Sequence, residues 1–380
     1  MRARPPLPDD IKQLMGLVRA GRLFDVQRWI AEGKRTVPPE PYWFSPLRTA
    51  IETGFHSMVE ILLQAGIDQD EKNTLLNRVV WNADLDLIQL LVDHGGDVHS
   101  VNLDSVFCTG NPEIIRFFLD RGLDAVTGDP FAHALKHPKR PFVGIYMRYR
   151  ESIPELKHQV NLALRHHARE GNLKWVSLLL WTGADPHVRL PEIGADPDPD
   201  VDSTALEEAV RFGHRAVVDR IGLDPQKADL SRLLVEACLK ADWSVIEQLL
   251  NLGAAANGSG DSEPMDRLLW AFGWKINPIF GPRSDFEMRT AFDTVLSFAD
   301  RGGRWNADRS SLNRFRRDLY KLDASWIERI ASGFHRHQVC SPELIACLVN
   351  TSKLKQLLGA RHAALLASIS GKRGGRAPKA

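Results

Sequence analysis

The sequence predicts an all-α solenoid of about ten to eleven stacked helix-turn-helix repeats, and three observations support this. A small residue, Gly or Ala, recurs along the chain with a Leu seven residues before it and a Gly twelve residues after it. A β-branched residue stands five residues after each small residue, and two apolar residues follow at eight and nine. Self-similarity at a period of roughly 20 to 50 residues is the signature of a repeat array.

Six copies of this frame are complete. Their small residues and closing glycines are Gly21/Gly33, Gly54/Gly66, Ala83/Gly95, Gly110/Gly122, Gly171/Gly183 and Ala241/Gly253. The apolar residues after each small residue form one stripe of a helix with 3.6 residues per turn. The closing Gly ends that helix because it adopts positive φ at little cost. Two helices this short cannot bury their own apolar faces, so the copies must stack.

Two further copies lie among these six. One is expected over 131–149, where Pro138 and its neighbours distort the turn between the helices. The other begins at Leu206 and turns at Gly213, but it reaches its closing glycine, Gly222, three residues early. Both copies therefore keep the frame while departing from its spacing.

The C-terminal third continues the frame less regularly. A ninth copy is split, with its first helix around 268–271, its second helix over 295–302 and an inserted loop at 274–289 between them. Two more helical pairs are expected, one around Leu319 and the other around Leu348. A continuous stack of these units would leave one extended inner surface.

Short motifs in the frame resemble those of a known family. The segments 45–50 (SPLRTA) and 204–209 (TALEEA) resemble degenerate forms of the Thr-Pro-Leu-His-x-Ala opening of ankyrin repeats. The segment 183–185 (GAD) resembles the Gly-Ala-Asp that closes such a repeat, and Gly171 with Asn172 matches the turn between its helices. The chain is therefore similar to the ankyrin-repeat family, and this resemblance implies an ankyrin-like α-solenoid.

The resemblance is strong over 14–125 and 162–255 and weaker elsewhere. The consensus His of the opening motif is absent throughout. It is replaced by Met15, Arg48, Asn77, Asp104, Arg165, Glu207 and Val235. This loss puts the usual polar network of the turns in question and indicates a divergent member, of bacterial or phage type.

The expected organisation has four segments along one elongated body. They are an N-terminal tail at 1–10, an ankyrin-repeat solenoid at 11–260, degenerate C-terminal repeats at 261–370 with the inserted loop, and a basic disordered tail at 371–380.

Composition excludes several other classes. The 380 residues are 43% hydrophobic with a formal net charge of +1, which gives no general reason to favour nucleic acid or an anionic membrane. No stretch approaches the roughly 20 apolar residues of a membrane span, and the first residues lack the apolar run of a secretory signal. The four cysteines fall mostly on apolar helix positions, which suits a reducing compartment. A cytoplasmic protein is expected.

Candidate binding residues follow from the resemblance. In ankyrin repeats the positions just before the inter-helix turn belong to the concave surface, and here they include Trp81, Arg169, Arg211, Phe212 and Lys240. Arg and aromatic residues are enriched at protein interfaces because both give a large contact area. We expect a protein partner that is at least partly acidic. The alternative at each position is a solvated face.

Two loops add aromatic residues. Tyr42, Trp43 and Phe44 follow a proline-rich segment and could either contact a partner or cap the core, and neither interpretation is preferred. Trp274 and Phe280 lie in the insertion of the ninth copy, where a long loop favours a binding role over mere packing.

Three constellations suggest chemistry, and each fails a test. The acids of 196–207 have the spacing of a calcium loop, but Val201 stands where that loop needs Gly. The His and Cys residues of 335–347 match no familiar zinc spacing. His167 occupies a small inner position of the repeat, so we expect it to be packed rather than catalytic. No metal, cofactor or catalytic residue is predicted.

The sequence therefore predicts a non-enzymatic protein-binding module, with no membrane contact and no small-molecule substrate. The resemblance implies an adaptor, a host-directed effector, or an inhibitor or immunity protein that neutralises a toxin or enzyme. The alternative function is nucleic-acid binding. It would use the segment 301–336, which holds nine basic and four acidic residues, together with the basic tail.

Overall fold

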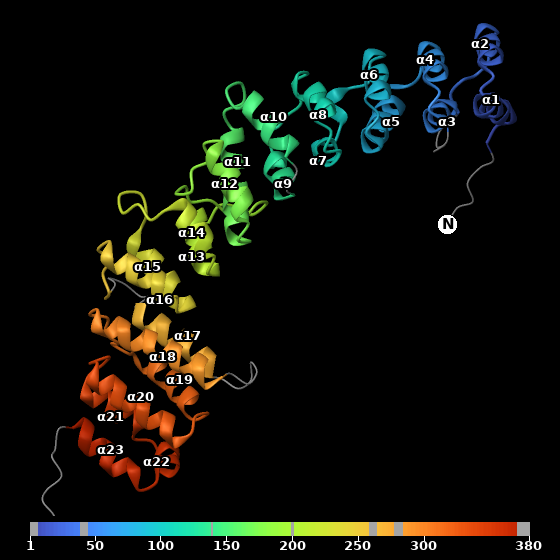
Figure 1. Ribbon diagram of the computed structural model, residues 1–380. Helices are drawn as coiled ribbons and strands as arrows, with labels where there is room; N and C mark the ends of the chain where they lie inside the picture. Colours follow the sequence, from blue (N-terminus) through green and yellow to red (C-terminus); the bar gives the residue numbers. More distant parts are fainter. Residues whose placement is uncertain are drawn as a thin grey trace, which may run out of the picture. The chain divides into compact units, whose positions relative to one another are not determined.

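A computed structural model describes residues 7–38, 45–137, 140–198, 201–257, 264–276 and 284–370. These residues form helices joined by short turns, and no strand occurs among them (Figure 1). An isolated bridge pairs Leu190 with Ser203 in the connection after α12. None of the described helices is long and apolar enough to cross a membrane.

The chain divides into two compact units. The first holds residues 1–163 with 192–196, and the second holds 164–191 with 197–380. The division falls within a helix, α11 (Leu156–Arg169).

The first unit contains five helical pairs and a 3₁₀ turn before α11. They are α1 (Asp9–Arg19), α2 (Leu23–Ala31), α3 (Pro46–Thr53), α4 (His56–Gln64), α5 (Gln69–Asn82), α6 (Leu85–Asp93), η1 (Val98–Ser100), α7 (Leu103–Cys108), α8 (Pro112–Leu119), α9 (Pro130–Lys136) and α10 (Pro141–Tyr149).

The second unit continues the pairs and ends in a helical trio. They are α12 (Leu173–Trp181), α13 (Ala205–Phe212), α14 (Arg215–Ile221), α15 (Leu230–Lys240), α16 (Trp243–Asn251), α17 (Pro264–Ile276), α18 (Asp285–Asp300), α19 (Arg309–Leu319), α20 (Ala324–Arg336), α21 (Pro342–Val349), α22 (Ser352–Leu358) and α23 (Arg361–Ile369).

The packing is that of a solenoid. Within each unit, first helices contact the first helix of a neighbouring pair, as in α1·α3, α5·α7 and α7·α9 of the first unit and in α13·α15 and α15·α17 of the second. Second helices contact one another in the same way, as α2·α4 and α12·α14 do. The fold is therefore an all-α, ankyrin-like α-solenoid, as the sequence predicted.

The turn residues have the backbone conformation that the frame requires. All six predicted small residues have positive φ: Gly21 67°, Gly54 69°, Ala83 55°, Gly110 65°, Gly171 70° and Ala241 53°. This left-handed conformation reverses the chain between the two helices of a pair. Ala83 and Ala241 adopt it despite their Cβ atoms, which cost about 1–2 kcal/mol in this region.

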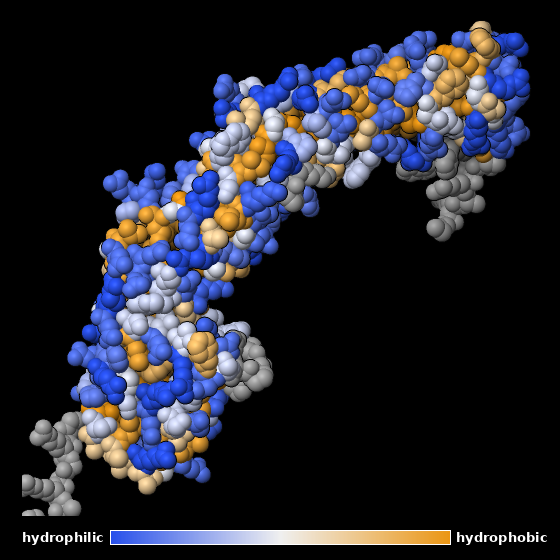
Figure 2. Space-filling view, in the orientation of Figure 1, coloured by the Kyte–Doolittle hydropathy of each residue, from blue (hydrophilic) through white to orange (hydrophobic). Residues whose placement is uncertain are grey.

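The frame also locates the core. Every β-branched residue five positions after the small residue is fully buried: Val26, Val59, Ile88, Ile115, Val176 and Ile246. The Leu seven residues before the small residue is buried in five copies, and Leu103 is the exception. Leu103 is the first residue of the short helix α7, so less of its side chain is covered. Hydrophilic residues cover most of the face shown in Figure 2, with apolar patches between them.

Both ends of the expected inserted loop at 274–289 are helical. Its first residues extend α17 to Ile276, whose side chain is buried, and its last residues belong to α18. A capping box starts α18 early, because Ser284 Oγ accepts from Glu287 N at 3.2 Å and Glu287 Oε2 accepts from Ser284 N at 3.0 Å. Only 277–283 separate the two helices, and these residues lie outside the described ranges.

The two ends also differ from expectation. The helix α1 begins at Asp9, inside the predicted tail, and the two acids of its first turn favour that start. The sequence also did not predict α23, which packs against α20 and α21 and buries Leu365 and Ile369. The predicted tail at 371–380 lies outside the described residues.

Candidate interaction surface

New side chains replace the missing histidine of the opening motif, and they link neighbouring repeats. Asn77 of α5 donates from Nδ2 to Ser100 O at 3.0 Å and accepts at Oδ1 from Asn102 N at 3.0 Å. These two bonds hold the connection that leads into α7, and they satisfy backbone groups that no helix pairs. At this position of α5, a neutral amide therefore links one repeat to the next.

The second unit uses ions at the same position. Arg165 of α11 donates from Nη2 to Glu208 Oε1 at 3.1 Å, from Nη1 to Pro191 O at 3.2 Å and from Nε to Ser203 Oγ at 2.9 Å. Both ends of the ion pair are buried, since the Arg165 side chain is 7% exposed and that of Glu208 is 1% exposed. This guanidinium thus ties α11 to α13 and to the connection between α12 and α13.

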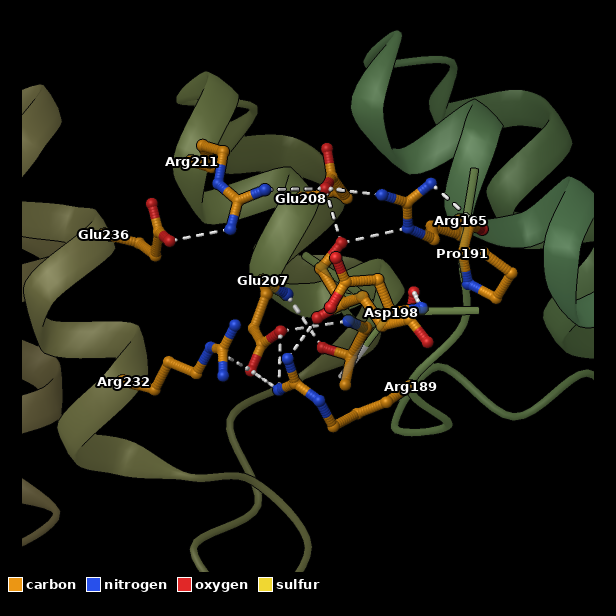
Figure 3. A network of polar contacts seen from close by, with 12 residues as sticks. Arg165, Arg189, Pro191, Asp198, Glu207, Glu208, Arg211, Arg232 and Glu236 are labelled. Carbon is orange, nitrogen blue, oxygen red and sulfur yellow. Dashed lines mark hydrogen bonds and ion pairs between the residues drawn. The ribbon is translucent and has the colours of Figure 1, made fainter. Parts of the chain in front are cut away.

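The ion pairs continue along the first helices of the second unit (Figure 3). Arg211 of α13 donates to Glu208 Oε1 at 2.9 Å and to Glu236 Oε1 of α15 at 2.7 Å. The contacts with Glu236 and Glu208 stabilise the charged form of Arg211, and they raise its pKa above the usual value even though burial lowers it.

Glu207 forms a second branch. Its carboxylate lies 2.9 Å from Arg189 Nη1 and 3.4 Å from Arg232 Nε, and it also closes a capping box with Thr204 at the start of α13. We call the two branches together the arginine–glutamate network. It consists of Arg165, Arg189, Glu207, Glu208, Arg211, Arg232 and Glu236. Because two guanidinium groups neutralise Glu207, this carboxylate serves the network rather than the calcium loop that its spacing suggested.

A predicted surface lies beside this network. Arg169, Phe212 and Lys240 come from the last turns of α11, α13 and α15, three successive first helices. The Phe212 ring is 39% exposed, with Arg169 Cζ 5.1 Å and Lys240 Nζ 5.7 Å from its centroid. The structure therefore brings together three residues that the sequence singled out separately. We call them the cationic–aromatic surface.

The turns beneath this surface position its side chains. His214 stacks on Phe212 with ring centroids 6.5 Å apart, and its Nε2 lies 2.7 Å from Arg169 O. A Cβ at Gly171 would lie 2.5 Å from His214 Nδ1, so the imidazole reaches this place only because residue 171 is Gly. The Phe212 ring is thus held in place before any partner arrives.

The other predicted residues are not part of this surface. Arg211 turns into the arginine–glutamate network, so its guanidinium is already engaged. Trp81 is 65% exposed at the end of α5, in the first unit. Trp274 is 44% exposed on α17 and pairs with Trp270 at a centroid distance of 5.8 Å. Tyr42, Trp43, Phe44 and Phe280 lie outside the described residues.

Sequence reasoning missed one supporting group and four aromatic residues that are exposed in the described ranges, namely Phe24, Trp181, Trp270 and Phe286. Trp270 is four residues before Trp274, so helical spacing could have revealed the pair. Trp181 is exposed on α12, a second helix, where the frame expects no contact surface. His214 follows the turn glycine, and no sequence signal indicated that it would stack on Phe212.

The constellations that suggested chemistry have structural roles. His167 is buried and stacks on Trp175 at 5.4 Å, which confirms a packed histidine. His337 Nδ1 lies 2.8 Å from an Asp300 carboxylate oxygen, and burial raises the pKa of the Cys340 thiol to about 12. His56, Asp84 and Asp86 gather donor atoms within 4.8 Å of one another, but Asp84 caps α6 through Leu87 N.

The basic segment 301–336 is partly used within the fold. Arg301 lies 3.9 Å from a Glu247 oxygen, and Arg314 lies 3.7 Å from an Asp266 oxygen. Arg316 donates to the backbone carbonyl of Cys347. These side chains hold neighbouring helices together, which leaves fewer cations to meet a phosphate backbone.

The fold and this surface define an ankyrin-like α-solenoid with an exposed cluster of cations and aromatic rings. No family model matches the chain. Over 219 residues, 53% of its length, the chain is 28% identical to an ankyrin repeat and KH domain-containing protein of the nematode Caenorhabditis briggsae. The chain spans 8% of the length of that relative.

Among solved structures, the human ASB11 ankyrin repeat domain is similar with a TM-score of 0.38 and 17% identity. The match covers 58% of this chain and all of that domain. The sequence relative is a nematode protein, so it gives no support to the bacterial or phage type that the sequence suggested.

Proposed function

We propose that this protein is a non-enzymatic interaction module that binds an at least partly acidic protein partner through the cationic–aromatic surface. The observation that carries the proposal is the exposed Phe212 ring between the cations of Arg169 and Lys240. A partner carboxylate can pair with either cation while an apolar group covers the ring. Arg and aromatic residues at the centre of an interface supply most of its binding energy.

The position of the surface on stacked helices favours the same function. Its three side chains come from helices that the arginine–glutamate network already ties together, so binding needs little reordering. Trp274 on α17 and Trp81 on α5 are further contact candidates, and both are exposed. We keep three roles for the complex: an adaptor, a host-directed effector, or an inhibitor or immunity protein. The proposed setting is the cytoplasm, in a bacterial or phage context.

Site-specific photo-crosslinking tests the proposal. We would place p-benzoylphenylalanine at position 212, on a first helix, and at position 181, an exposed Trp on a second helix. Irradiation in an extract of the native cell should crosslink one protein at position 212 and none at position 181. Equal yields at both positions, or no protein product at position 212, would count against the surface.

Charge-matched variants sharpen the result. Arg169→Ala with Lys240→Ala should reduce the crosslink at position 212 by about tenfold or more, since removing hot-spot residues costs more than about 1 kcal/mol each. Arg215→Ala with Lys227→Ala removes the same charge from exposed positions outside the surface and should leave the yield unchanged. A similar loss in both variants would indicate general charge attraction instead.

The nucleic-acid alternative has a separate readout. A 20-base-pair duplex is the probe, titrated against the full chain at two salt concentrations. Phosphate contacts release counterions, so a protein that binds the duplex through them loses affinity steeply as salt rises. We expect no saturable binding at physiological salt. A submicromolar complex with a steep salt dependence would favour the alternative.

A further inference from the structure

A cavity in the first unit lies outside the surface described above. It has a volume of about 520 Å³ and is enclosed by α7, α9 and α10. Pockets that hold ligands or anchoring side chains usually measure about 300–1,000 Å³. The cavity is therefore large enough for a bulky side chain and the backbone next to it.

Short helices explain why a hollow occurs here. The helix α7 has six residues and α9 has seven, which makes them the shortest first helices in the described stack. Short first helices leave space between the helices around them. The rings of Phe107 and Phe142 line the cavity, and each is only 1–2% exposed, since they pack against Phe131 on their other side.

The rim of the cavity is polar, and it carries one lysine, one acid and two histidines. Lys136, His133 and His137 line it from α9 and the residue after it, and Asp104 is the one acid among the lining residues. Beyond the rim, Arg140 is exposed immediately before α10. With Lys136 and Arg140 against Asp104, the surroundings of the cavity carry one excess positive charge, which favours a ligand with an apolar group next to a carboxylate.

The walls are held in place by a buried side chain. Gln159 of α11 is 1% exposed, accepts at Oε1 from Phe131 N at 2.7 Å and donates from Nε2 to Ala125 O at 2.6 Å. This clamp fixes the start of α9. His133 packs against Gly194, where a Cβ would lie 3.5 Å from the ring. A preformed cavity binds with a smaller ordering cost than a mobile one.

We propose that this cavity is a second binding site, which takes a peptide segment of a protein partner by inserting one aromatic or branched apolar side chain flanked by Asp or Glu. The apolar side chain would fill the hollow that Phe107, Ala134 and Phe142 line, and a flanking carboxylate would meet Lys136. The site stands on residues of the first unit alone, so its failure leaves the cationic–aromatic surface untouched, and the reverse also holds.

Labelled peptides test the chemistry of the ligand. The probes are a fluorescein-labelled pentapeptide Asp-Glu-Phe-Asp-Glu, its basic counterpart Lys-Arg-Phe-Lys-Arg, and the acidic peptide with Ala at its centre. Anisotropy with the full chain should show at least about tenfold tighter binding of the first peptide than of either other one, a difference of about 1.4 kcal/mol. Equal affinity for all three peptides would overturn the proposal.

Variants locate the binding. Ala134→Phe should fill the cavity and Lys136→Glu should reverse the charge of its rim, and each should weaken the first peptide by about tenfold or more. Lys34→Glu makes the same charge change at an exposed position of the same unit and should have no effect. Thermal unfolding checks that each variant folds. Unchanged binding in folded Ala134→Phe would place the peptide elsewhere and overturn the proposal.

Cys108 offers a readout without peptides. It is exposed and lines the cavity, whereas Cys347 is exposed elsewhere, and burial raises the pKa of the Cys238 and Cys340 thiols. The probes are disulfides of 4-mercaptophenylacetate and of cysteamine, and exchange transfers one half of the disulfide to the protein thiolate while the other half leaves as a thiol.

The aromatic acid should label Cys108 at least about fivefold more than the amine does, and Cys347 should show a smaller preference. The ratio at Cys108 should fall in Ala134→Phe. If the two thiols show the same preference, the cavity does not select this chemistry. If free phenylacetate competes as well as the first peptide does, the site takes a small aromatic acid and not a peptide segment.

Discussion

The same motif position links neighbouring repeats by neutral hydrogen bonds at Asn77 in the first unit and by ions at Arg165 and Glu207 in the second. In the first unit Asn77 makes two neutral hydrogen bonds to the next connection, and its side chain is partly exposed. In the second unit Arg165 and Glu207 occupy that position and join a network of buried ions. The position therefore demands a long-range polar link rather than a particular residue, and an amide, a guanidinium or a carboxylate can provide it.

The ionic solution has a cost that the neutral one avoids. Glu208 Oε2 and Glu236 Oε2 are buried and, within the described ranges, have no hydrogen-bond partner. A buried charge that is incompletely satisfied offsets part of the energy gained from its ion pairs. The network thus contributes more to the choice of which helices pack together than to the stability of that packing.

Breaking the ionic link should have the largest effect. Glu208→Ala leaves the buried Arg165 guanidinium without its carboxylate, so the free energy of unfolding should fall by about 3–5 kcal/mol. Urea unfolding of the full chain measures it. The control Glu32→Ala removes an exposed acid from the first unit and should change little. A loss below about 1 kcal/mol would mean that the network contributes little to stability.

Breaking the neutral link should cost less. Asn77→Ala leaves Ser100 O and Asn102 N without their partner, and because water reaches part of this site, a loss of about 1–2 kcal/mol is expected. The same unfolding measurement tests it, with Asn82→Ala at the exposed end of α5 as the control. If Asn77→Ala were as damaging as Glu208→Ala, the contrast between the units would fail.

A buried acid without a cation sharpens the comparison. Glu71 of α5 has its Oε1 buried with no hydrogen-bond partner among the described residues. Burial raises the pKa of Glu71, the hydrogen bond with Ser45 lowers it, and the negative charge of Asp68 raises it further, so the net pKa is raised. A raised folded-state pKa contributes stability below the unfolded value near 4.3, and this stability is lost as pH rises through the folded value.

Glu71→Gln should therefore stabilise the protein at neutral pH and flatten its stability as pH rises above the ordinary glutamate pKa of about 4.3. Thermal unfolding across that range gives the measurement. An unchanged pH profile in the variant would show that Glu71 is not the titrating group. Glu60→Gln, an exposed glutamate of α4, is the matched control.

The smallest effects should come from the turns, which the two units share. Ala83→Gly and Ala241→Gly relieve positive φ and should each add about 0.5–1 kcal/mol, after the entropy cost of glycine. Gly54→Ala is the reverse exchange, and since a Cβ there meets nothing within 4 Å, only backbone strain should lower stability, by about 1 kcal/mol. A change of the same sign in both directions would contradict this account.

Local backbone requirements are what the sequence predicted best. Each turn residue and each buried β-branched residue follows from a spacing of a few residues, so the frame located both. The proximity of Arg169, Phe212 and Lys240 was also predictable, because the residues one or two positions before successive turns lie close together in a regular stack.

Long-range pairing was not predictable in the same way. Arg165 and Glu208 are 43 residues apart, and Glu207 had the spacing of a calcium ligand because its arginine partners, Arg189 and Arg232, come from other elements. The early start of α18 carried a signal, the Ser284 and Glu287 capping box, which the expectation of a loop obscured. The cavity at α7 and α9 depends on helix lengths, and a periodic frame does not contain them.

The two alanines at left-handed turns bear on how such a chain diverges. Each exchange of Gly for Ala is a tolerable penalty in a long array, because the helices on either side keep the reversal in place. The repeats can therefore lose their consensus residues one substitution at a time, while the path of the backbone persists. In such a protein the backbone torsion angles of the turns persist after the sequence motifs have changed.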